Sequence, residues 1–193
     1  PRIERLRDAT RRLAHFTHQM LALARSSSEG ALIAEHQPVE LGALLEDAAS
    51  ELLDAALAKE IDLGFEAGPA SVVGSRWMLR EMLANLIDNA IKYRDPARAL
   101  TIAINGSLHG GKVRYTVADT GLGIAEEFQP KVWQLFHRLN PNGTVAGEGL
   151  GLTLVRRILE RLHGHISLTS KAGEGSCFTI ELPACSTSGD SHA

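Results

Sequence analysis

Apolar side chains recur at intervals of three and four residues over four stretches of this 193-residue chain, and this spacing places them on one face of a helix. The pattern predicts helices over residues 2–25, 40–60, 76–93 and 150–162, and a short helix around Phe128–Leu139. Between the helices, apolar and polar residues alternate as in half-buried strands. The predicted strands cover residues 61–67, 71–74, 100–105, 112–119, 165–170 and 176–183.

The helix over residues 2–25 carries a coiled-coil-like apolar stripe, formed by Ile3, Leu6, Ala9, Leu13, Phe16, Met20 and Leu23. A lone helix cannot bury such a stripe, so we expect this helix to pack in a bundle with another helix of this chain or of a second copy. The serine-rich run that follows it marks a linker. This divides the chain into a bundle helix (1–27), a linker running as an extended connector through Pro38 (28–38), a larger domain (39–184) and a disordered polar tail (185–193).

The order of elements predicts an α+β fold. Strands 100–105 and 112–119, and strands 165–170 and 176–183, are joined by short turns, so each pair must be antiparallel. We therefore expect a two-layer α/β sandwich, with a mixed sheet that carries helices on one face, preceded by the long bundle-forming helix.

Composition narrows the classes of partner. The net charge is −3 and there is no basic block, so nothing indicates a nucleic-acid partner. The two cysteines, Cys177 and Cys185, lack metal-ligand spacing, which favours ordinary reduced thiols. No stretch approaches the ~18 consecutive apolar residues of a membrane span. The chain starts at Pro1, already inside a helical pattern, and we expect it to be a piece of a longer protein.

Three groups of residues indicate a nucleotide site. Gly147, Gly149 and Gly151 stand at the start of the helix that begins at Leu150, and a helix N-terminus attracts phosphate; a tight loop that uses glycines for packing is the alternative. Asn85 and Asn89 lie one turn apart on the polar face of helix 76–93, where their carbonyl oxygens suit Mg²⁺, although most such faces are simply solvated. Asp119 ends a strand, and its carboxylate can accept a hydrogen bond from an amine such as that of adenine; an ordinary turn is the alternative.

Together these segments resemble the ATP-binding domain of two-component sensor histidine kinases, of the Bergerat fold shared with gyrase and heat-shock chaperones. "EMLANLIDNAIKY" is similar to the N box of this family, "DTGLGI" to its first glycine box, "VWQLFHR" to its F box and "GEGLGLTLV" to its second glycine box. The resemblance covers about residues 37–184. Residues 2–25 resemble the second helix of the dimerisation bundle, in the manner of QseC/TctE-like kinases.

The resemblance implies a role for individual residues. Asn89 would ligate Mg²⁺ with Asn85 beside it, Lys92 would approach phosphate, and Asp119 would bind the adenine amine. The nucleotide site would further include Tyr93, Gly121, Gly123, Arg138, Gly147, Gly149, Leu150, Gly151 and Ser176. The cofactors would be ATP and Mg²⁺. Departures from the pattern are Trp133 in the F box, His165 in place of a glycine, and Glu148, whose charge would stand beside a polyphosphate.

The family's phosphoacceptor box is absent from the sequence. His15 and His18 lack its acidic neighbour, so we expect the acceptor histidine to lie upstream, on a helix outside the chain. The expected function is transfer of the γ-phosphoryl of ATP to that histidine and relay to a response regulator. Homodimerisation through the bundle and a cytoplasmic position in an inner-membrane protein are also expected. The alternatives are a Bergerat-fold ATPase, disfavoured because Asn85 stands where the ATPases carry a carboxylate general base, and a nucleotide-binding scaffold or anti-sigma-type kinase.

Overall fold

The computed structural model describes Thr17, Leu21, Asp47 and residues 37–44, 61–67, 71–134 and 149–185. Its elements are β1 (Gln37–Glu40), β2 (Asp62–Ala67), β3 (Ser71–Gly74), α4 (Arg76–Lys92), β4 (Thr101–His109), β5 (Lys112–Asp119), the 3₁₀ helix η1 (Glu126–Lys131), α5 (Gly151–Arg161), β6 (His165–Lys171) and β7 (Gly175–Pro183). Apart from Thr17 and Leu21, the predicted bundle helix lies outside the described residues, as do residues 186–193 of the predicted tail. Within these ranges no helix combines the length and the hydrophobicity needed to span a bilayer.

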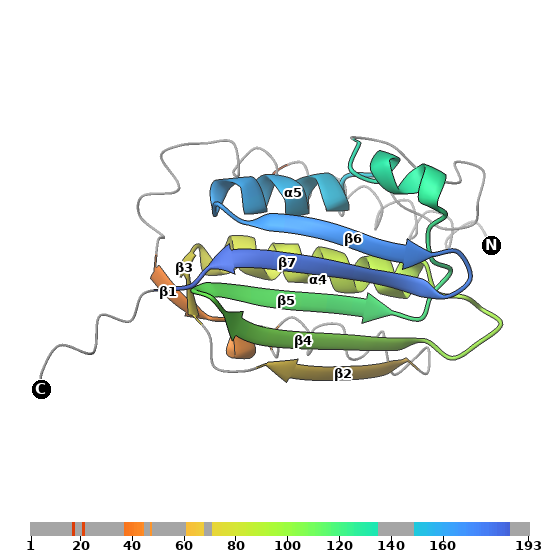
Figure 1. Ribbon diagram of the computed structural model, residues 1–193, viewed down its shortest axis with the longest axis horizontal. Helices are drawn as coiled ribbons and strands as arrows, with labels where there is room; N and C mark the ends of the chain where they lie inside the picture. Colours follow the sequence, from red (N-terminus) through yellow and green to blue (C-terminus); the bar gives the residue numbers. More distant parts are fainter. Residues whose placement is uncertain are drawn as a thin grey trace, which may run out of the picture.

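Five strands form a mixed sheet in the order β2-β4-β5-β7-β6. Strand β2 pairs in parallel with β4, whereas β4–β5, β5–β7 and β6–β7 are antiparallel. Figure 1 shows α4 running behind β5 and β7, and α5 lying beside β6. The prediction of an α+β sandwich with a mixed sheet and two antiparallel hairpins is confirmed for this part of the chain.

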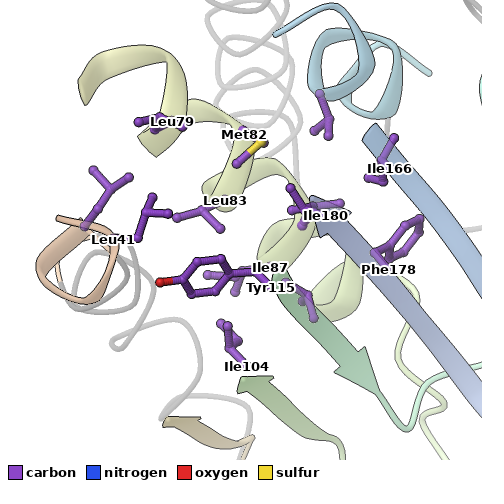
Figure 2. Close-up of a cluster of buried hydrophobic side chains, with 14 of the residues drawn as sticks. Leu41, Leu79, Met82, Leu83, Ile87, Ile104, Tyr115, Ile166, Phe178 and Ile180 are labelled. Carbon is purple, nitrogen blue, oxygen red and sulfur yellow. The ribbon is translucent and has the colours of Figure 1, made fainter. Parts of the chain in front are cut away.

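The core lies between the helices and the inner face of the sheet. The predicted apolar stripe of α4 is buried throughout, with Leu79, Met82, Leu83, Leu86, Ile87, Ala90 and Ile91 at 5% exposure or less. Figure 2 shows part of this cluster, in which Ile87 of α4 lies near Tyr115 and Ile104 of the sheet. Burial of these side chains is the main favourable contribution to folding.

Tyr115 packs its ring over a glycine of the neighbouring strand. It pairs with Gly106, and a Cβ on Gly106 would lie 2.3 Å from the Tyr115 ring, so only glycine leaves room for this ring. The Tyr115 hydroxyl is buried and has no hydrogen-bond partner among the described residues. In Figure 2 it points toward the segment that carries Leu41.

Two local predictions were wrong. Gln37–Glu40, expected to form a connector and the start of a helix, is strand β1, which pairs antiparallel with β3; residues 41–44 are helical. The short helix expected around Phe128–Leu139 is instead the 3₁₀ helix Glu126–Lys131. Pro130 lies inside it, and because proline has no N–H it cannot extend a regular hydrogen-bonded helix. Residues 135–139 are outside the described ranges.

Candidate functional site

The asparagines of α4 face the start of α5. Asn85 is 8% exposed, and its amide nitrogen donates to the Glu81 carbonyl oxygen at 2.7 Å. This bond directs the amide oxygen toward Gly151, where a Cβ would stand 2.8 Å from Asn85 Oδ1 and 3.8 Å from Asn89 Nδ2. The start of α5 therefore lies against the asparagine face. A polar helix face is more often simply solvated, and this one is not.

Among the described residues, no side chain caps the first turn of α5. Gly149 adopts a positive φ of 71°, and Leu150 stands at the N-cap position. A leucine side chain cannot accept a hydrogen bond, so it leaves the N–H groups of the first turn without a side-chain cap. Unpaired N–H groups at the positive end of a helix suit a phosphate group.

Lys92 is held by a neighbour on its own helix. Its ammonium lies 2.5 Å from the Asp88 carboxylate, and both side chains are about 30% exposed. The structure thus places Lys92 on the same helix as the asparagines, in an ion pair that it would have to leave in order to reach a phosphate. Such partly exposed pairs contribute little to stability, so this one can be exchanged for another anion.

Asp119 lies at the end of β5, as the sequence predicts, with Ser176 opposite it on β7. Its Oδ1 accepts a hydrogen bond from the Gly121 N–H at 2.8 Å. Burial raises the pKa of the Asp119 carboxyl above its usual value, while hydrogen bonds from Gly121 and Ser176 and the charge of Arg98 partly offset this effect. A half-buried carboxylate with its orientation fixed can recognise an amine donor by a charge-assisted hydrogen bond.

Glycines let the loop after Asp119 lie against its neighbours. A Cβ on Gly121 would stand 2.6 Å from the Tyr93 carbonyl oxygen, and one on Gly123, which has a φ of +65°, would stand 2.0 Å from the Lys171 carbonyl oxygen. The Tyr93 carbonyl also accepts the Leu122 N–H at 2.9 Å. Tyr93, at the C-terminal end of α4 and 40% exposed, therefore links the asparagine helix to the Asp119 loop.

The β6–β7 hairpin holds the other side of this loop. The Ser170 hydroxyl accepts the Ile124 N–H at 2.8 Å and lies 3.0 Å from the Ser176 hydroxyl. Gln129 of η1 donates to the carbonyl oxygens of Ile124 (3.1 Å) and Ser170 (2.8 Å). The sequence does not predict the roles of Ser170 and Gln129. Their contacts depend on the folded path of the loop that follows Asp119, and neither residue belongs to a recognisable local motif.

The predicted residues thus gather in two groups joined by α4. Asn85 and Asn89 meet Gly151 on the C-terminal half of α4. Asp119, Gly121, Ser176 and Tyr93 gather just beyond the C-terminal end of the same helix, one turn from Asn89. Arg138 and Gly147 lie outside the described residues, so their predicted positions stay predictions.

The residues present fit a hydrated magnesium ion. Among the described ranges no three His, Cys, Asp or Glu side chains gather as a metal site. The amide oxygens of α4 are neutral oxygen donors of a kind that Mg²⁺ accepts, and Asn85 directs its oxygen toward Gly151 at the start of α5. Mg²⁺ keeps several waters and takes few protein oxygens when phosphates complete its shell, so one or two amide oxygens suffice.

Comparison with known proteins gives the class of this domain. Residues 74–186, more than half of the chain, match the family of histidine kinase-, DNA gyrase B-, and HSP90-like ATPases. The chain belongs to this family. Within it, the domain is the ATP-binding catalytic domain of a two-component sensor histidine kinase.

Curated relatives of similar sequence are sensor kinases. The chain is 33% identical over 171 residues to the sensor protein kinase PmrB of Pseudomonas aeruginosa, covering 89% of this chain and 35% of PmrB. It is 30% identical over 181 residues to the sensor histidine kinase GlrK of Escherichia coli, covering 93% and 37% respectively. It therefore spans only about a third of these curated relatives.

Two solved structures share the fold. Full-length ShkA in complex with AMPPNP superposes with a TM-score of 0.78 at 25% identity, over 95% of this chain and 38% of ShkA. The catalytic domain of the histidine kinase ThkA superposes with a TM-score of 0.67 at 28% identity, over 77% of this chain and 95% of that domain. The high coverage of the ThkA domain confirms the Bergerat-type fold.

Proposed function

We propose that this chain binds Mg·ATP between the asparagine face of α4 and the loop that follows Asp119, and passes the γ-phosphoryl to a histidine on a bundle helix outside these 193 residues. The observation that carries the proposal is the contact of Gly151 with Asn85. It brings two neutral amides to the uncapped start of a helix, which is where a metal–phosphate group would be stabilised.

In the proposed complex, Asp119 and Ser176 receive the adenine, and Gly121, Gly123 and Tyr93 shape the wall around it. Lys92 exchanges Asp88 for a phosphate, while Arg138 and the segment Gly147–Gly151 lie on the phosphate side. Asn89, with Asn85 beside it, would hold Mg²⁺, which neutralises phosphate charge when bound. That ShkA was solved in complex with AMPPNP, an analogue of ATP, supports the choice of nucleotide.

Transfer to a protein side chain is favoured over hydrolysis by the chemistry of Asn85. Related ATPases need a general base to activate water, and an amide cannot take a proton. The chain's own contribution would be to position the nucleotide and to exclude water, which is most of what phosphoryl transfer requires.

The wider context is part of the proposal. The similarity to PmrB and GlrK, which are named as sensor kinases, supports relay of the phosphoryl to a response regulator. It also supports homodimerisation through the bundle helix predicted over residues 1–27, and a cytoplasmic position for this part of a membrane-anchored sensor. The division into a bundle helix, a linker (28–38), a catalytic domain (39–184) and a tail (185–193) stays a prediction.

Calorimetric titration with ADP, with and without Mg²⁺, tests the nucleotide site. We expect a dissociation constant in the micromolar-to-millimolar range, and tighter binding with Mg²⁺. Asn89→Ala should abolish the Mg²⁺ effect, whereas Asn105→Ala, on an exposed position of β4, should keep it. A folded chain that gives no heat with ADP would overturn the proposal.

Labelling with γ-labelled ATP tests where the acceptor lies. The chain should bind nucleotide but should not form acid-labile phosphohistidine. Labelling that disappears in a His15→Gln/His18→Gln double variant would place the acceptor within the chain.

A further inference from the structure

Arg98 lies in the loop between α4 and β4, outside every motif that resembles the kinase boxes. Its Nη2 donates to the Gly121 carbonyl oxygen at 2.5 Å, in the loop that follows Asp119. Its Nε lies 3.5 Å from Asp95 Oδ2. A guanidinium that contacts a carboxylate with one nitrogen and a carbonyl with another is fixed in orientation, because its planar fork has few ways to satisfy both.

The Asp95 side chain is in turn held by its own loop. Its Oδ1 accepts the Ala97 N–H at 3.0 Å, and this bond closes a local turn. The loop therefore presents Arg98 on a supported base, although the guanidinium itself is partly exposed, at 37% for the side chain.

Gly121 connects this support to Asp119. Its N–H donates to Asp119 Oδ1, while its carbonyl accepts from Arg98. Glycine has the widest backbone freedom of any residue, so hydrogen bonds from outside must fix its two peptide groups. The Gly121–Leu122 peptide group is held at its carbonyl oxygen by Arg98 and at its N–H by the Tyr93 carbonyl oxygen. The N–H of Gly121, on the preceding peptide group, binds the Asp119 carboxylate.

We propose that Arg98 is a positioning residue for adenine recognition: by holding the Gly121 carbonyl it fixes the direction in which Asp119 meets the 6-amino group of the nucleotide. This inference rests on the proposed function. The positive charge of Arg98 also favours recognition of the amine. It partly offsets the rise in the pKa of Asp119 that burial causes, and so it favours the ionised carboxylate, which accepts hydrogen bonds.

The test compares two ligands on four variants of the 193-residue chain. The ligands are ADP and purine riboside 5′-diphosphate, which lacks the 6-amino group. The variants are the parent, Arg98→Gln, Arg98→Lys and Arg114→Gln. Arg114 is a matched control, because it is an arginine bonded to Glu181 on the exposed face of β5. Its replacement removes the same charge as the replacement of Arg98.

We expect Arg98→Gln to weaken ADP binding about tenfold, as loss of a charge-assisted hydrogen bond does. Its effect on purine riboside 5′-diphosphate should be less than about twofold, because the amine contact is already absent. Arg98→Lys keeps the positive charge but loses the planar fork, so its affinity for ADP should lie between that of Arg98→Gln and that of the parent. Arg114→Gln should match the parent on both ligands.

Equal losses on the two ligands, or no loss on ADP, would overturn the role of Arg98. If the parent itself does not bind ADP, it is the proposed function that fails. Thermal unfolding is followed for each variant, and if Arg98→Gln does not fold, Asp95→Asn replaces it. This variant removes the carboxylate beside Arg98 but keeps an oxygen that can accept the Ala97 N–H. It should lose affinity for ADP but not for purine riboside 5′-diphosphate. An equal loss of affinity for the two ligands, or no loss for ADP, would again contradict the proposal.

Discussion

Gly151, at the first residue of α5, lies directly against the Asn85 side chain of α4, so that a Cβ at this position would stand 2.8 Å from the amide oxygen. Asn85 cannot easily move aside, because its nitrogen is bonded to the Glu81 carbonyl. Packing therefore accounts for the third glycine of the glycine-rich stretch. The first turn of α5 has no side-chain cap among the described residues, so the packing and the phosphate interpretations of this stretch are compatible.

Gly151→Ala should lower the stability of the domain. The added methyl group meets a buried and bonded amide, and overpacking of this kind costs about 1–3 kcal/mol. Urea unfolding measures the change. Gly64→Ala is the matched control, because no heavy atom lies within 4 Å of a Cβ there; an equal effect of the two replacements would show that the contact is not tight.

Asp119→Asn should weaken ADP binding by about 1–3 kcal/mol, because a charge-assisted hydrogen bond becomes a neutral one. Calorimetry at pH 7.5 measures the loss. The same affinity in the variant would mean that adenine does not lie at Asp119.

The same replacement should have the opposite effect on stability without nucleotide. The pKa of Asp119 is raised in the folded domain, so between the unfolded and folded pKa values the folded state binds more protons and its stability falls as pH rises. Asp119→Asn removes this dependence. The variant should therefore gain stability relative to the parent as pH rises from the ordinary carboxyl range through the raised pKa, and urea unfolding over a pH series would show it.

Asp88→Asn should strengthen nucleotide binding. Lys92 is paired with Asp88 in the absence of nucleotide, and releasing it removes both a competing anion and a repulsion toward phosphate; we expect about a two- to fivefold gain. Glu160→Gln is the control, since it breaks the Arg156–Glu160 pair of the same spacing on α5. A loss of affinity in Asp88→Asn would mean that Asp88 itself takes part in binding.

Tyr115→Phe should keep or raise stability at neutral pH. The hydroxyl is buried without a partner among the described residues, so removing it relieves a desolvation cost. Burial, followed by the charge of Glu40, raises the pKa of Tyr115 from 10.0 to about 12. The parent should therefore lose stability between these two pH values, where the folded state keeps a proton that the unfolded state releases, and the variant should lose less.

Much of the fold could be predicted because its signals are local. The stripe of α4 and the two antiparallel hairpins follow from periodicity and turn residues within single segments. Strand β1 could not be predicted in this way, since the four residues Gln37–Glu40 carry no alternation and become a strand only by pairing with β3. The 3₁₀ helix at Glu126–Lys131 had a local signal in Pro130, which favours an early end to helical hydrogen bonding.

In the candidate site, too, some residues have a local sequence signal and others depend on contacts between distant segments. Asn85, Asn89 and Asp119 stand out in the sequence by residue type and spacing. The burial of Asn85 could not be predicted from α4 alone, because Gly151 of α5 covers it. Arg98 and Ser170 had no signal at all, since each acts on the backbone of a loop far away in the chain.

The loop that follows Asp119 is anchored on both sides by residues that the structure describes. Arg98 and Tyr93 hold it from one side, and the β6–β7 hairpin holds it from the other through Ser170. A recognition surface that is already assembled needs no polyphosphate to form it. We therefore expect flat aromatic amines of fragment size to occupy it independently of magnesium, which makes this wall a starting point for inhibitors that compete with the nucleotide base alone.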